Sequence, residues 1–149
     1  MKLEDIQELW HRDSTIDYTE LGTESIRIPQ IHDKYLKIFT DERIRLKGVE
    51  FELSKMVRIK TEYYSGKMSQ EEIAEYGWDF DPFQGLKVLK GEMEYYYEAD
   101  TDIQKSEDKI QYIKTCIDTV YEIIENVKWR HQTIGNQYSR SPRSRETRQ

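Results

Sequence analysis

The feature that most constrains the fold is a heptad repeat of apolar residues in the last third of the chain. Apolar side chains recur there at steps of three and four residues, with Ser106 as a polar break and His131 on the same face: Ile103, Ile110, Ile113, Ile117, Val120, Ile124, Val127 and Ile134. This spacing places them along one side of a long α-helix, and isoleucine at both seam positions favours more than two packed helices. We therefore predict that Ile110, Ile113, Ile117, Val120, Ile124 and Val127 form a helix–helix interface that holds copies of the chain together.

A second seam lies in the middle of the chain, at steps of 3-4-3-4-3. It runs through Leu46, Val49, Leu53, Met56, Lys60 and Tyr63, with Lys60 as its polar member. The C-terminal seam can close against other copies or against residues 46–63 of the same chain, and the two arrangements are not exclusive. Both favour an all-α, elongated subunit with a long central helix and a C-terminal heptad helix.

The composition agrees with helices that each bury only one stripe. Of the 149 residues 36% are hydrophobic and 35% are charged, and three prolines leave long stretches without a helix breaker. No apolar run approaches the roughly 20 residues that a membrane helix requires. Cys116 is the single cysteine, so we expect a small buried side chain and a reducing compartment.

Charge is distributed unevenly. The net charge is -6, but residues 128–149 hold six cations against one carboxylate and so contribute +5, which leaves -11 for the rest. An acidic body argues against uniform coating of nucleic acid. It permits a local binding strip or contact with a basic partner.

Local signals divide the chain into further elements. We predict a short helix over residues 3–10, a second helix opened by Asp17 and interrupted or restarted at Pro29, and an end to the central helix at Gly66. Ser69 opens a short helix that stops at Gly77. Four regions follow: 1–66 as an N-terminal helical region that contains the cation-rich segment 57–67, 67–85 with a short helix and aromatic loop, 86–136 for oligomerisation, and 137–149 as a disordered basic tail.

The aromatic segment 77–85, GWDFDPFQG, is predicted to be an ordered loop that packs Trp78, Phe80 and Phe83 onto the body. The alternative is a linear docking motif. Residues 86–99 resume a helical pattern after it.

The segment VRIKTEYYSGK, residues 57–67, combines cations with a tyrosine pair. In a helix Lys60 and Tyr64 share a face, so a tyrosine ring could stack on a base while cations contact phosphates. The alternative is structural: Arg58 pairs with Glu62 on the surface, and the tyrosines pack in the seam. The residues alone leave both open.

Catalytic motifs find little support. The three histidines are scattered, and Glu8 with His11 forms one Glu-x-x-His where di-iron bundles need two. Phosphate-binding glycine loops are missing from the sequence. We predict no enzyme activity, no metal and no cofactor; a carboxylate metalloenzyme is the weaker of two rivals, the other being a helical adaptor that binds only proteins.

The N-terminal block MKLEDIQELW and the box basic-x-basic-x-acidic-Tyr-Tyr-Ser-Gly at residues 58–66 resemble the UvsY family, recombination mediators of T4-like bacteriophages. The similarity extends over roughly residues 1–138. It implies a helical protein that assembles through its C-terminal region into a ring-like homo-oligomer, a hexamer or heptamer. It also implies binding of single-stranded DNA and loading of a RecA-like recombinase onto DNA covered by single-stranded-DNA-binding protein, in the cytoplasm of the host cell.

On this resemblance Arg58 and Lys60 become the expected phosphate contacts. Lys55, Tyr63, Tyr64 and Lys67 complete the predicted DNA-binding set. The order here is Arg58 then Lys60, whereas the family pattern is Lys then Arg. The charge is the same, but a planar guanidinium and a compact ammonium group exchange places. The basic tail is longer than the family pattern.

Overall fold

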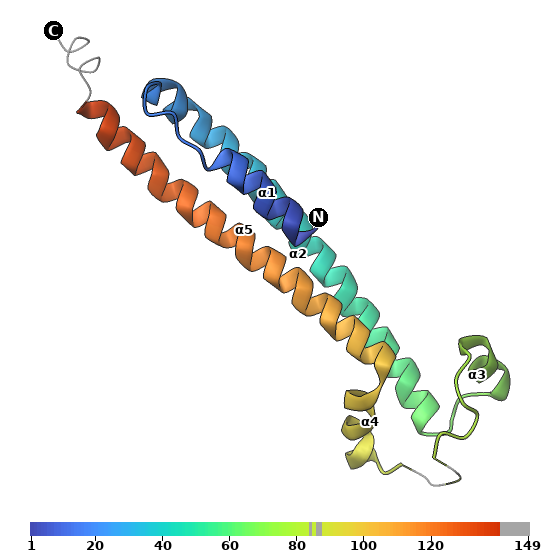
Figure 1. Cartoon of the computed structure of the whole chain (residues 1–149). Helices are drawn as coiled ribbons and strands as arrows, with labels where there is room; N and C mark the ends of the chain where they lie inside the picture. Colours follow the sequence, from blue (N-terminus) through green and yellow to red (C-terminus); the bar gives the residue numbers. More distant parts are fainter. Residues whose placement is uncertain (84, 86–87, 141–149) are drawn as a thin grey trace. The chain divides into compact units, whose positions relative to one another are not determined.

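A computed structural model of the chain describes residues 1–83, 85 and 88–140. Over these residues the fold is all-helical, as predicted (Figure 1). The elements are α1 (Leu3–Asp13), α2 (Leu21–Tyr64), α3 (Gln70–Tyr76), the short 3-10 helix η1 (Lys90–Glu92), α4 (Met93–Ala99) and α5 (Thr101–Ser139). The chain divides into two compact units: unit 1 is Met1–Arg45 with Tyr112–Gln149, and unit 2 is Leu46–Gln111.

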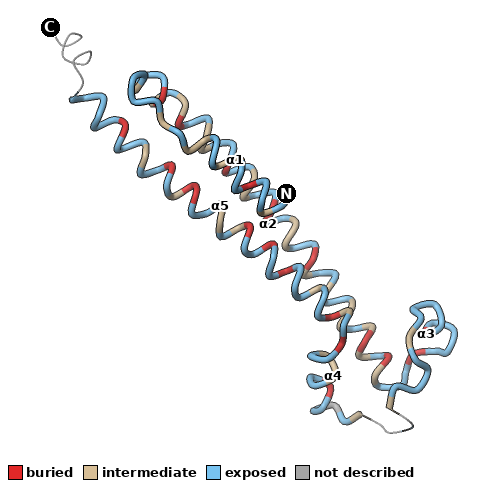
Figure 2. Tube along the Cα trace, in the orientation of Figure 1, coloured by how far each residue is buried: buried red, intermediate tan, exposed pale blue. Residues whose placement is uncertain are grey.

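The core of unit 1 is built from α1, the first half of α2 and the second half of α5. Trp10 of α1 meets the edge of Tyr35 of α2, with ring centroids 5.7 Å apart. Figure 2 shows buried positions recurring turn after turn along the long helices. The buried members of this core are Ile6, Ile28, Tyr35, Cys116, Val120, Ile123, Ile124, Val127 and Ile134.

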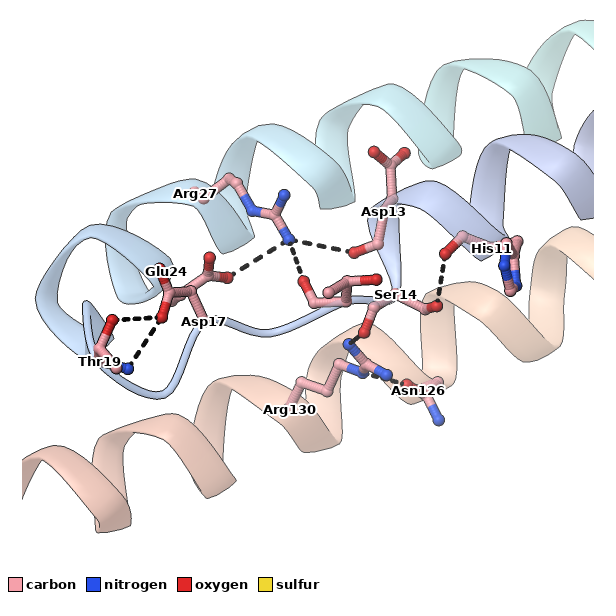
Figure 3. A network of polar contacts seen from close by, with 10 residues as sticks. His11, Asp13, Ser14, Asp17, Thr19, Glu24, Arg27, Asn126 and Arg130 are labelled. Atoms are coloured by element: carbon pink, nitrogen blue, oxygen red, sulfur yellow. Dashed lines mark hydrogen bonds and ion pairs between the residues drawn. The ribbon is translucent and has the colours of Figure 1, made fainter.

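Two arginines fix the connection between α1 and α2 (Figure 3). The guanidinium of Arg27 donates hydrogen bonds to the carbonyl oxygens of Asp13, at 3.1 Å, and Thr15, at 2.9 Å. Arg130 of α5 donates to the carbonyl oxygen of Ser14. These bonds satisfy carbonyl groups at the end of α1 and in the loop, and so hold the loop against α2 through Arg27 and against α5 through Arg130.

The start of α2 differs from the prediction. The carboxylate of Asp17 accepts hydrogen bonds from the amide and the hydroxyl of Thr19, which forms a local turn, and α2 begins later, at Leu21. The predicted interruption at Pro29 is also wrong, because Pro29 lies inside α2. A proline costs about 3 kcal/mol in a helix interior. Burial of neighbouring side chains such as Ile28 offsets this cost.

The C-terminal heptad seam is confirmed as a buried stripe, with a shift in register. Ile117 is only partly buried and His131 is exposed, whereas Cys116 and Ile123 are buried in addition. An α-helix with 3.6 residues per turn drifts by about 20° per heptad from a 3.5-residue repeat, so the buried stripe moves to neighbouring positions. The predicted seam positions that are buried are Ile103, Ile110, Ile113, Val120, Ile124, Val127 and Ile134.

Unit 2 contains the end of α2, where the second predicted seam is also confirmed. Val49, Lys60 and Tyr63 are buried, and Leu46, Leu53 and Met56 are partly buried. A small cluster of Tyr63, Met68 and Ile73 joins the end of α2 to α3.

Glycines end the helices of unit 2 where the sequence predicts. Gly66 follows α2 with φ 76°, and Gly77 follows α3 with φ 70°, in the left-handed region that glycine adopts without strain. The hydroxyl of Ser69 accepts a hydrogen bond from the amide of Glu72 at 3.2 Å, which confirms the predicted N-cap of α3.

Three predictions for the second half of the chain need correction. Phe80 is 61% exposed and does not pack on the body, although Trp78 and Phe83 are partly buried as predicted. Within 86–99 the α-helix begins only at Met93, after η1, and residues 86–87 lie outside the described residues. The helix α5 continues to Ser139, so residues 137–139 of the predicted tail are helical; the prediction for residues 141–149 lies outside the described part.

Candidate nucleic-acid interface

Lys60, one of the two predicted phosphate contacts, is buried in unit 2. Its ammonium group lies 2.9 Å from a carboxylate oxygen of Asp100 and 3.0 Å from one of Asp102, and only 4% of the residue is exposed. The same group lies 3.7 Å from the ring centroid of Trp78, within the range of a cation–π interaction. In this arrangement Lys60 contacts carboxylates and an indole ring of its own chain.

Asp100 connects this ion pair to the start of α5. One of its carboxylate oxygens accepts hydrogen bonds from the amides of Asp102, at 2.9 Å, and Ile103, at 3.1 Å, which is the geometry of a helix N-cap. The other oxygen faces Lys60 and accepts a hydrogen bond from the hydroxyl of Tyr64. Asp100 therefore joins α2 and α5 within unit 2.

The electrostatics of Asp100 follow from these contacts. Burial acts to raise the pKa of its carboxyl group, but the hydrogen bonds from Tyr64, Lys60 and the backbone of Ile103 outweigh it and hold the pKa below the usual value. Burial, and then the hydrogen bond to Asp100, raises the pKa of the Tyr64 hydroxyl. The carboxylate is thus ionised and the phenol neutral at neutral pH.

The rings of Tyr63 and Tyr64 contact other aromatic rings. Tyr63 lies 4.9 Å from Trp78 between ring centroids, and its hydroxyl donates to the carbonyl oxygen of Asp79 at 2.6 Å. Tyr64 lies 5.6 Å from Phe83 and has further ring neighbours. In this structure both tyrosines pack against side chains of their own chain, as the structural alternative for this segment predicts.

The other three predicted DNA-binding residues are exposed. Lys55 and Arg58 lie on the outer side of α2, and Lys67 follows Gly66 at its end. Among the described residues none of these three cations has an ion pair, hydrogen bond or ring contact with another side chain. The surface ion pair that the structural alternative places between Arg58 and Glu62 does not form in this part of the chain.

The cations around these residues form a local excess. Residues 47–67 hold five lysines and arginines against three carboxylates, whereas residues 68–111 hold four against twelve. A polyanion that approaches unit 2 is therefore attracted to the end of α2 and repelled by the rest of the unit.

Five of the six residues predicted to join copies of the chain are buried within the single chain. Ile113 and Val120 are completely buried in the single chain, and Val127 is 2% exposed. Ile110 and Ile124 are buried as well, while Ile117 is partly buried. The five buried side chains are therefore covered by the chain's own residues, and the prediction that the seam joins copies of the chain stays a prediction.

The described residues hold neither a metal-ligand cluster nor a membrane-spanning helix. Across residues 1–83, 85 and 88–140, no group of three or more His, Cys, Asp or Glu side chains is arranged to hold a metal ion. No helix in the same residues has the length and apolar character needed to cross a membrane.

Comparison with known families then identifies the chain. The family model described as "Recombination, repair and ssDNA binding protein UvsY" matches residues 9–140. The chain belongs to the UvsY family. It is thus a non-enzymatic recombination mediator of a single-stranded-DNA-binding family, as the sequence predicts. The two rival interpretations, a protein-only adaptor and a metalloenzyme, are set aside.

Individual relatives support the same assignment. The UvsY-family chain is 26% identical over 130 residues to the recombination protein UvsY of Enterobacteria phage T4. The matched region covers 87% of this chain and 88% of that protein. Two crystal structures of the bacteriophage T4 recombination mediator protein UvsY share its fold. The lattice type II structure has a TM-score of 0.79 at 24% identity and covers 99% of this chain and 98% of that one; the lattice type IV structure has a TM-score of 0.74 at 24% identity and covers 91% and 93%.

Proposed function

We propose that this UvsY-family chain binds single-stranded DNA on the exposed cations at the end of α2. We further propose that it loads a RecA-like recombinase, in the host cytoplasm, onto DNA covered by single-stranded-DNA-binding protein. The observation that supports the DNA contact is the group of unpaired, exposed cations Lys55, Arg58 and Lys67 in an otherwise acidic unit. Cations without a protein partner are free to neutralise phosphates, and this term supplies most non-specific affinity for nucleic acids.

Lys60 takes a different part in this proposal. Its ammonium group is already neutralised by Asp100 and Asp102, so transfer to a phosphate would leave a buried carboxylate without its partner. We infer that Lys60, with Tyr63 and Tyr64, fixes the end of α2 and so orients the exposed cations. The predicted DNA-binding set then consists of three contacting and three positioning residues.

A homo-oligomer would strengthen a weak patch of this kind. Three cations in one subunit give modest affinity at physiological salt, but copies held together present the patch repeatedly at high effective concentration. Because the apolar seam of α5 is buried within the chain, we propose that other surfaces hold the hexamer or heptamer together. Trp129, which is 69% exposed, is the largest exposed apolar side chain of α5. Tryptophan is enriched among the residues that contribute most to protein–protein interfaces.

The DNA contact is tested by replacing Lys55 and Arg58 together with alanine. Affinity for a short fluorescent oligothymidylate, measured by anisotropy at several salt concentrations, should fall. The slope of log K against log salt should become shallower by about 1.4 for each subunit in contact, since each lost contact to a single strand removes about 0.7. The thermal unfolding midpoint should stay within a degree or two, since both side chains are exposed.

Lys105 and Lys109 provide the matched control. They are exposed lysines of α5 in the same unit, and replacing both with alanine removes the same charge. This control variant should keep most of the salt dependence. Equal losses in the two double variants would show that only net charge matters, and an unchanged slope in the Lys55 and Arg58 variant would refute the proposed contact.

A further inference from the structure

An exposed aromatic ring lies on the same side of α2 as the unpaired cations. Phe51 is 64% exposed and has no ring partner among the residues that the structure describes. Lys47 lies four residues before Phe51 and Lys55 four residues after it. Arg58 lies three residues after Lys55. Residues at these spacings are neighbours on one face of an α-helix.

This face is defined here as the Phe51 stripe: Lys47, Phe51, Lys55 and Arg58. All four side chains are exposed, and none is engaged by an ion pair or hydrogen bond within the described part of the chain. The stripe extends about 17 Å along the helix axis. Glu62 lies one turn beyond Arg58 on this face, and Glu50 and Glu52 border the stripe three residues from Lys47 and Lys55, without forming an ion pair with either lysine in the described part of the chain.

Three other cations of α2 are engaged within the protein, whereas Lys37, on a different part of the helix, is exposed and has no ion pair or hydrogen bond among the described residues. Lys34 pairs with Asp13 at 2.7 Å, Arg45 pairs with Glu42 at 3.1 Å, and Lys60 is buried. Single exposed apolar residues are common on protein surfaces and need no explanation. The Phe51 stripe differs because an exposed ring and three unengaged cations occur together.

The other strongly exposed rings of unit 2 have the opposite surroundings. Tyr95, which is 74% exposed, lies three residues from Glu92 and from Glu98. Phe80 lies between Asp79 and Asp81 in the sequence, and Phe51 lies between Glu50 and Glu52. Phe51 belongs to α2, however, where successive residues are about 100° apart, so the residues one turn before and after it on its own face are Lys47 and Lys55. Cations at these positions attract a polyanion to the ring.

We propose that Phe51 stacks on a base of the bound single strand while Lys47, Lys55 and Arg58 contact the adjacent phosphates. This inference rests on the proposed DNA contact of α2 and extends it by two helical turns toward Lys47. Aromatic stacking tolerates any base, and it operates together with a cationic groove that follows the backbone. It gives a role to Phe51, while the tyrosines of the sequence motif pack inside the unit.

The test separates base stacking from charge with two probes of equal length and charge: an oligothymidylate and an abasic oligomer. The wild-type protein should bind the oligothymidylate about tenfold more tightly than the abasic oligomer. Phe51→Ala should lower the affinity for oligothymidylate to the abasic level and leave binding of the abasic oligomer unchanged. Phe51→Tyr should restore the preference, and Tyr95→Ala, the matched exposed ring, should retain it.

Two results would overturn this assignment. One is an unchanged preference for bases in Phe51→Ala, and the other is an equal loss for both probes. A change in sedimentation with base preference intact would instead place Phe51 in a protein interface, which also refutes stacking. These results are distinct from failure of the DNA contact itself, which is an unchanged salt slope in the Lys55 and Arg58 double variant.

Discussion

Lys60→Ala is expected to lower the free energy of unfolding by about 3–5 kcal/mol. The substitution leaves the carboxylate of Asp100 buried, with 5% of that residue exposed, and without the cation that neutralises it. It also removes the ammonium group from the face of Trp78. Urea denaturation followed by circular dichroism at neutral pH measures the change.

Two companion variants distinguish the ion pair from other causes. Arg58→Ala, at an exposed and unpaired cation two residues earlier, should change stability by no more than about 0.5 kcal/mol. Adding Asp100→Asn to the Lys60 variant should recover part of the loss, since the amide keeps an oxygen for the N-cap and removes the unpaired charge. A Lys60→Ala variant as stable as wild type would show that Lys60 is not held by its carboxylates in solution.

Ile113→Ala is expected to lower the free energy of unfolding by about 2–5 kcal/mol, because Ile113 is completely buried within the single chain. Ile117→Ala, at a partly buried position of the same helix, should have a smaller effect. If the α5 seam were instead the contact between copies, Ile113→Ala would give stable, folded monomers. Denaturation curves and analytical ultracentrifugation of both variants separate these outcomes.

The sequence predicts the helices well because local chemistry fixes them. The apolar repeats determine which faces of α2 and α5 are buried, and Ser69, Gly66 and Gly77 mark helix ends through backbone groups a few residues away. Pro29 was misjudged because the burial that outweighs its local cost comes from α1 and α5. Local rules therefore fail where contacts distant in the sequence decide the outcome.

The candidate site shows the same limit. The motif of residues 57–67 indicates where cations gather, but the position of Lys60 depends on Asp100, forty residues later. The polar residue in the second seam was a usable signal, because a lysine on a buried stripe requires a partner. Phe51 was missed because its environment only becomes visible once its helical face is known to be exposed.

The central claim is that exposed cations of α2 contact single-stranded DNA while Lys60 stays in its internal ion pair. Amine acylation of the intact protein, with and without a saturating oligothymidylate, measures this for each lysine by mass spectrometry. DNA should protect Lys55 and Lys67 and leave Lys105 unchanged. Lys60 should react slowly in both states. Protection of Lys105 in place of Lys55 and Lys67, or fast acylation of Lys60 that DNA suppresses, would contradict this claim.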